Sequence, residues 1–80
     1  MNELKRLCDL PLNKTAVVAG VGGGNSRKRI NDLGIVEGCR ITPVFKSPFG
    51  DPVAYFVKHT LIALRNKDSS EIWVRCDDDI

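Results

Sequence analysis

Several features that mark large classes of protein are missing from this sequence. No apolar run approaches the roughly 18 residues that a membrane-spanning helix needs. The first residues, Met1 to Leu7, lack the long apolar core of a secretory signal peptide. The three cysteines are odd in number and form no Cys-x-x-Cys pair, which indicates reduced thiols rather than a disulfide framework. We therefore expect a cytoplasmic protein with no direct membrane insertion.

Residues that hold metals or perform catalysis are also scarce. A zinc site usually takes its ligands from closely spaced pairs, whereas Cys8, Cys39, His59 and Cys76 are scattered along the chain. Carboxylates are paired only in the acidic run at 77–79, near the end of the chain. We expect inert thiols, no metal ligands, no required cofactor and no enzymatic activity.

A glycine-rich stretch from Gly20 to Gly34 organises the rest of the chain. The apolar run before it, at 16–19, predicts a strand, and a strand followed by a glycine loop suggests a phosphate site. A dinucleotide-binding fingerprint requires a third glycine where this chain has Asn25, and a P-loop requires a Gly-Lys-Ser/Thr ending that is missing. The glycines therefore indicate a bend and close packing rather than a nucleotide site.

The residues after this bend predict a short helix. Asn25 or Ser26 is placed to accept hydrogen bonds from the N–H groups of its first turn. Ile30 and Leu33 are three positions apart and share one face, and Gly34 stands where a residue with positive φ ends a helix. A helix of about two turns is unstable alone in water, so it must dock on a sheet.

Alternating apolar and polar residues, interrupted by turn residues, predict the strands of that sheet. The strands are expected at 15–20, 39–46, 53–58, 61–65 and 72–76. In the second of these, Cys39, Ile41 and Phe45 share the inner face. Pro43 has no N–H to donate, which indicates a bulge or an edge at that point.

The length of 80 residues fits one domain, 1–80, with 1–14 as an N-terminal cover segment and 76–80 as a frayed acidic tail. Leu4, Leu7 and Leu10 recur at threes, so the cover segment contains either a helical turn or an extended strip. Closing such a small sheet removes its free edges and buries one face. We expect a mainly β domain, a small SH3-like β-barrel of about five strands, with a short α-helix inserted after the first strand. The two apolar helix residues would plug one open end, and an OB-type barrel is the second choice.

A series of short motifs extends over nearly the whole chain. They are Leu7 and Leu10, Gly23 and Gly24, Arg29-Ile30, Leu33-Gly34, Gly38, Pro48, Gly50-Asp51-Pro52, Ile62-Ala63-Leu64-Arg65, Ile72 and Val74. In order and spacing these motifs resemble the FeoA family, small cytosolic accessory proteins of bacterial ferrous iron transport. We expect turn or cap roles for Gly23, Gly24, Gly34, Gly38, Gly50 and Asp51.

The resemblance implies a non-enzymatic protein that binds the FeoB-like membrane transporter, whose cytosolic part is a GTP-binding domain. The same domain resembles the C-terminal module of iron-dependent repressors. The alternative function is therefore a metal-responsive regulatory domain that binds a transition metal ion or a peptide. We expect the isolated protein to be a monomer, with weak transition metal binding left open.

Four residues are candidates for partner contacts. Arg27 and Lys28 fall in the first turn of the predicted helix, where the helix dipole disfavours cations by about a few tenths of a kcal/mol. They are either solvated or directed at an acidic partner, while a net charge of only +2 disfavours nucleic acid. Phe49, in a proline-rich loop, and Trp73 either fold back on the barrel or form exposed anchors. We expect the helix N-terminus and a neighbouring loop carrying Phe49 to dock on the transporter.

We predict that folding requires neither a metal nor a disulfide, because the cysteine spacing provides no pairs of ligands. A chelator and a reductant together should leave the cooperative thermal transition, followed by circular dichroism, in place. Loss of that transition on adding chelator alone, with metal in the purified protein, would instead favour the metal-responsive alternative.

Overall fold

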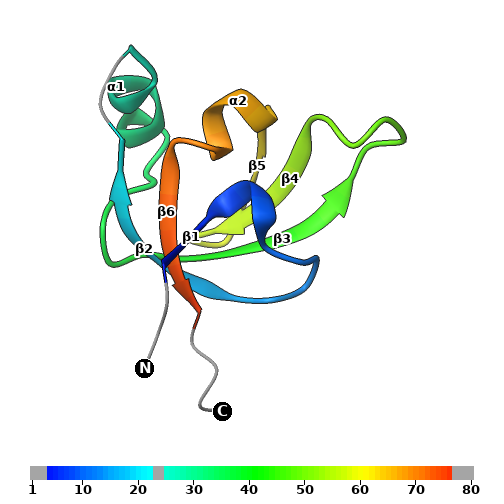
Figure 1. Cartoon of the computed structure of the whole chain (residues 1–80), viewed down its shortest axis with the longest axis horizontal. Coiled ribbons are helices and arrows are strands. Elements are labelled where there is room, and N and C mark those ends of the chain that lie inside the picture. The colour runs from blue at the N-terminus through cyan, green and yellow to red at the C-terminus, as the bar shows by residue number, and fades with distance from the viewer. Residues whose placement is uncertain (1–3, 23–24, 77–80) are drawn as a thin grey trace.

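The computed structural model describes residues 4–22 and 25–76, with the side chains of residues 25 and 26 left out of the description. The strands are β1 (Leu4–Arg6), β2 (Ala16–Val21), β3 (Arg40–Lys46), β4 (Val53–Val57), β5 (Thr60–Leu64) and β6 (Ile72–Cys76). The helices are α1 (Asn25–Asp32), α2 (Asn66–Ser69) and the 3-10 turn η1 (Leu7–Asp9). Figure 1 shows α1 and the loop between β3 and β4 at opposite ends of the molecule.

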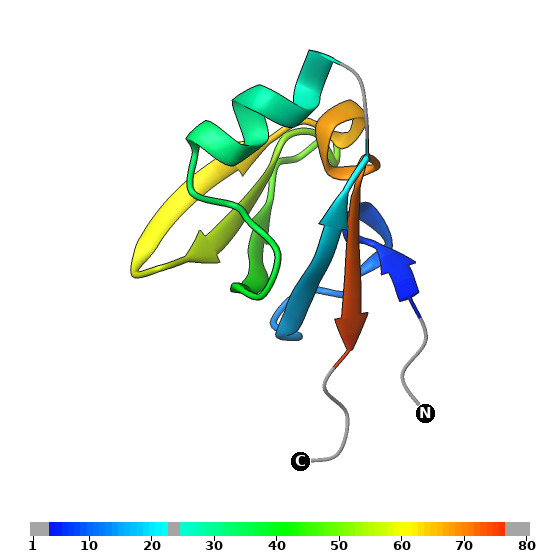
Figure 2. The same ribbon diagram turned by 90° about the vertical axis from the view of Figure 1, so that its left-hand side faces the viewer.

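The six strands form one antiparallel sheet in the order β1-β6-β2-β3-β4-β5. The run predicted as the first strand, now β2, is central, as its two apolar faces indicated. The sheet bends at β3, which separates the group β1, β6 and β2 from the group β4 and β5 (Figure 2).

The mainly β prediction is therefore confirmed, but two details of it are wrong. The chain has six strands rather than about five, because residues 4–6 pair with β6, and α1 consequently follows the second strand. The predicted closed barrel is also wrong, since no pairing in the described part of the chain joins β1 to β5. Bending lets the open sheet enclose a core between its two groups of strands without closing.

The core draws on every strand except β1. Its buried apolar members are Leu7, Leu10, Ala16, Val18, Ile30, Ile35, Ile41, Val53, Tyr55, Val57, Leu64, Ile72, Val74 and Cys76. Both alternatives for the cover segment occur in turn, an extended strip at β1 and a helical turn at η1. Leu7 and Leu10 are buried, while Leu4 stays exposed.

Only one of the two apolar residues predicted to share a face of α1 lies in the core. Ile30 is buried, but Leu33 is 42% exposed, so the prediction that both plug the sheet is wrong for Leu33. The helix ends at Asp32, and Gly34, with φ of +93°, turns the chain so that Ile35 is buried instead. The predicted cap by residue 25 or 26 and the glycines at 23 and 24 lie outside what the structure describes.

The predicted bulge near Pro43 is present and changes which face its neighbours occupy. The register between β3 and β4 shifts between Pro43 and Phe45. Pro43 is fully buried beside Ile41, whereas Phe45 is 63% exposed. The prediction that Phe45 faces the core was therefore wrong, because the extra residue in the bulge reverses the alternation after it.

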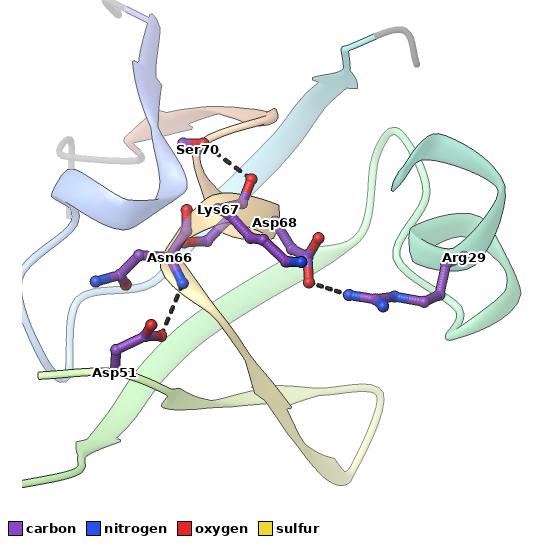
Figure 3. Close-up of polar contacts among 7 residues, drawn as sticks. Arg29, Asp51, Asn66, Lys67, Asp68 and Ser70 are labelled. Atoms are coloured by element: carbon purple, nitrogen blue, oxygen red, sulfur yellow. Dashed lines mark hydrogen bonds and ion pairs between the residues drawn. The ribbon is translucent and has the colours of Figure 1, made fainter. Parts of the chain in front are cut away.

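One ion pair holds α1 to α2 (Figure 3). A guanidinium nitrogen of Arg29 donates to the Oδ2 atom of Asp68, whose side chain is only 2% exposed. A buried carboxylate is costly unless it is hydrogen-bonded and paired with a positive charge. Arg29 therefore has a structural role, in which it holds α1 against α2.

We predict that Gly34→Ala destabilises the protein by about 1 kcal/mol, because alanine disfavours positive φ. A Cβ at this position would meet no atom within 4 Å, so the backbone conformation alone carries the effect. Gly20→Ala is the matched control, since that site is equally open and has no positive φ. Thermal unfolding in which the two variants melt at the same temperature would contradict the prediction.

We predict that Arg29→Met lowers the free energy of unfolding by roughly 1.5–3 kcal/mol, the usual worth of a hydrogen bond to a charged group. The substitution keeps the length and apolar stem of the side chain but removes the charge that Asp68 faces. Urea unfolding measures the loss, and Arg27→Met serves as the control on an exposed position of the same helix. Equal stability of the two variants would show that the ion pair does not hold α1 in place.

Candidate partner-binding surfaces

Arg27 and Lys28 are both exposed on α1. The first turn of this helix contains no acidic residue to offset them, so the helix dipole opposes both charges. Arg27 also borders a shallow hollow of about 250 Å³ beside the end of β2 and the segment 36–37. These cations are therefore accessible to a partner, and the helix dipole does not stabilise them.

Phe49 is 97% exposed at the tip of the loop between β3 and β4. The interpretation that it folds back over the sheet is therefore wrong. A tight turn holds the loop, in which the N–H of Gly50 donates to the carbonyl of Ser47 at 2.8 Å. The φ of Gly50 is +84°, a conformation that a side chain at this position would disfavour.

The same loop is fastened to the start of α2 (Figure 3). The backbone N–H of Asn66 donates to the Oδ1 atom of Asp51 at 2.9 Å, and the Asn66 side chain donates to the carbonyl of Gly50 at 3.4 Å. Asp51 thus helps to fix the conformation of the loop that carries the exposed Phe49.

Trp73 lies on β6 opposite Arg6 of β1, and its side chain is partly exposed. The guanidinium carbon of Arg6 lies 5.5 Å from the centre of the indole ring, within the range of a cation–π contact. This local contact occupies part of the surface that Trp73 would offer to a partner.

The structure does not bring these candidates together. The predicted docking surface combined the helix N-terminus with a neighbouring loop, but α1 and the loop carrying Phe49 lie at opposite ends of the molecule (Figure 1). Trp73 lies on β6, which β2 and β3 separate from β4 in the sheet, but its register partner on β2 is Gly20, a residue that borders the same hollow as Arg27. The loop carrying Phe49 and the helix α1 therefore form separate surfaces.

A further exposed surface was missed by the sequence analysis. Phe45, Phe56 and Leu61 are exposed on the outer face of β3, β4 and β5, where Phe56 lies opposite Leu61. Beside Phe56 is a hollow of about 500 Å³, lined by Thr15, Arg40, Thr42, Phe56, Lys58 and His59. The alternation within the third predicted strand already placed Phe56 opposite the core side, but the bulge in β3 hid the orientation of Phe45.

Two titratable side chains of the described residues have pKa values shifted by burial. Burial raises the pKa of the Cys8 thiol above its usual value, which keeps that thiol protonated, and burial likewise raises the pKa of Tyr55. Among residues 4–22 and 25–76, no group of three or more His, Cys, Asp or Glu residues is placed to hold a metal ion. No helix in the same part of the chain is long and apolar enough to cross a membrane.

Comparison with known proteins identifies relatives over most or all of the chain. A fusion protein of Fe(2+) transport protein A and Fe(2+) transporter FeoB from Porphyromonas gingivalis is 40% identical over 70 residues, which cover 86% of this chain and only 8% of that protein. The solved FeoA-like protein of Clostridium acetobutylicum has a TM-score of 0.91 at 27% identity and covers 100% of this chain and 94% of its own. Zinc-complexed FeoA of Stenotrophomonas maltophilia, described as an SH3 domain protein, has a TM-score of 0.75 at 32% identity, covering 92% and 88% of the two chains.

These likenesses support the predicted SH3-like fold. The fold also occurs in a manganese-dependent transcriptional repressor, with a TM-score of 0.84 over 95% of this chain and 43% of the repressor. At 15% identity, the likeness to the repressor shows the fold alone. The FeoA domain family matches residues 5–76, nearly the whole described chain, and the chain belongs to this family.

Proposed function

We propose that this chain is a non-enzymatic accessory protein of ferrous iron transport that binds the cytosolic part of a FeoB-type transporter. The observation that carries the proposal is the relative from Porphyromonas gingivalis, in which a segment 40% identical to this chain is fused to FeoB. Fusion of two proteins into one chain keeps them together, so it supports association of the separate chains. The proposed place of action is the cytoplasmic side of the membrane, where that partner domain lies.

Phe49 and the cations of α1 are proposed as two contact points on this partner. Phe49 is almost fully exposed, and its loop is already ordered by contacts to Asn66, so little conformational entropy is lost on binding. Arg27 and Lys28 are exposed and would attract an acidic surface over a longer range. The two contact points lie far apart, so they would act on different parts of the partner.

The metal-responsive alternative rests on weaker support. The relative from Stenotrophomonas maltophilia was solved in complex with zinc, and the repressor likeness shares the fold. Within the described residues of this chain, however, no cluster of three candidate ligands exists. Weak transition metal binding therefore remains a secondary proposal, in which a second molecule or solvent completes the ligand set.

We predict separate kinetic effects for the two contact points. Phe49→Ala should raise the rate of dissociation from the transporter's cytosolic domain by about tenfold or more, since removing a buried anchor acts mainly on dissociation. Arg27→Glu with Lys28→Glu should slow association and weaken its dependence on salt, since exposed charges act mainly on encounter. Kinetics on an immobilised partner domain, at two salt concentrations, measure both.

The control is Lys5→Glu with Arg75→Glu, the same change in charge placed on β1 and β6, where both residues are exposed. The association rate of this control should change between the two salt concentrations by about as much as that of the parent. If Phe49→Ala and the α1 variant both match the parent at both salt concentrations, these residues do not form the interface. If the parent itself does not bind the cytosolic domain, the proposed function is wrong.

A further inference from the structure

β5 is a free edge of the sheet, because only β4 pairs with it in the described structure. The strand reads Thr-Leu-Ile-Ala-Leu and contains no charged residue and no proline. Edge strands are usually protected by lysine, proline or a bulge, since their unpaired N–H and C=O groups otherwise invite another strand. The register with β4 is also regular throughout, so no bulge protects β5.

The register shows which backbone groups of β5 face this free edge. A two-residue turn at 58–59, with positive φ at both positions, joins β4 to β5. Such a turn is closed by a hydrogen-bonded pair, here Val57 and Thr60, and hydrogen-bonded pairs alternate along an antiparallel ladder. Leu61 and Ala63 therefore direct their backbone N–H and C=O groups away from β4.

The side chains at these positions enlarge the exposed surface. Leu61 is 63% exposed opposite Phe56, and Ala63 is exposed opposite Ala54, which in turn lies opposite Phe45 on β3. All five side chains are apolar, and they occupy neighbouring positions on the outer face of three strands. A contiguous exposed apolar patch of this kind marks an interaction site more often than a scattered exposed residue does.

The rim of this patch is basic. From residue 40 to residue 65, the sequence contains Arg40, Lys46, Lys58 and Arg65 and a single acidic residue, Asp51. The carboxylate of that acidic residue accepts the hydrogen bond from α2 already described. Arg40 and Lys58 line the hollow at the turn end of β5, and Arg65 directly follows its other end. An occupant with carboxylates at both ends therefore matches the charges around β5.

A second copy of the chain fits this surface poorly. Antiparallel pairing of two β5 strands about Ile62 would place Arg65 of one copy beside His59 and Lys58 of the other. Lys58 would be one position away from the residue directly opposite Arg65, and two cations at neighbouring positions repel each other. An acidic segment from another protein would instead gain an attraction at each of these positions.

We propose that the free edge and outer face of β5 bind an extended acidic segment of a partner protein, which adds to the sheet as a further strand. Its backbone would pair with Leu61 and Ala63, its apolar side chains would cover Phe56 and Leu61, and its carboxylates would meet the basic rim. The inference rests on the proposed function only in assuming that the chain acts by binding another protein.

The direct test uses a capped peptide of alternating valine and threonine residues with glutamates at both ends. When this peptide is added, two-dimensional NMR of the whole chain should show chemical-shift changes concentrated at β5. Hydrogen exchange should slow at the amides of Leu61 and Ala63. The amides of Thr60 and Ile62, which already face β4, should change less. A peptide with lysines at both ends should bind at least about tenfold more weakly, a difference of about 1.4 kcal/mol.

Variants of the chain separate the backbone from the charges. Leu61→Pro removes an outward N–H without removing a bond to β4, and it should weaken peptide binding at least about tenfold. If that variant does not fold, Leu61→Lys tests the same position with the charge that natural edge strands use for protection. Arg40→Glu with Arg65→Glu should weaken binding to a similar extent, whereas the control Lys5→Glu with Arg75→Glu should not.

Three results would overturn the proposal. They are equal binding of the two peptides, unchanged exchange at Leu61 and Ala63, and a dimer in analytical ultracentrifugation that Leu61→Lys dissociates, since the last makes a second copy the occupant. The peptide experiment contains no transporter. If the chain binds the peptide but not the FeoB domain, this inference stands and the proposed function is refuted. If the chain binds the FeoB domain but not the peptide, the proposed function stands and this inference is refuted.

Discussion

The buried carboxylate of Asp68 is the polar group that joins the two helices of this fold. Its side chain is 2% exposed, and it accepts the charge-assisted hydrogen bond from Arg29 of α1. Because α1 has only eight residues, it cannot persist alone in water and depends on this bond and on the burial of Ile30. Asn66 on the same short helix fastens the loop that carries Phe49. A single turn of helix thus holds both ends of the molecule in fixed relation.

The bend of the sheet at β3 explains how a chain of this size encloses a core without closing a barrel. β3 pairs with β2 on one side and with β4 on the other, so the inner faces of both groups of strands meet over one set of apolar side chains. The bulge after Pro43 then turns Phe45 to the outside. The exposure of Phe45 on the outer face of the sheet is therefore a result of this local irregularity.

Local patterns were sufficient to predict most elements, but they did not predict the long-range pairing of strands. Period-two alternation located β2 to β6 within a residue or two, and the position of Gly34 predicted a helix end that the positive φ confirms. The pairing of residues 4–6 with β6 joins opposite ends of the chain, and no local pattern encodes it. The same limit applies to the surfaces. The separation of Phe49 from α1 and the free edge of β5 depend on strand order, which hydrophobic periodicity does not specify.

The basic residues that flank β5 also act when no partner is present. A chain with a net charge of only +2 has little overall repulsion to keep copies apart in solution. The cations at the two ends of the uncharged strand supply that repulsion locally, where two copies would otherwise join edge to edge. Salt screens such charges over about 10 Å at 0.1 M, so it would weaken this protection and the proposed attraction to an acidic segment together. Colloidal stability and partner selectivity therefore share one dependence on ionic strength.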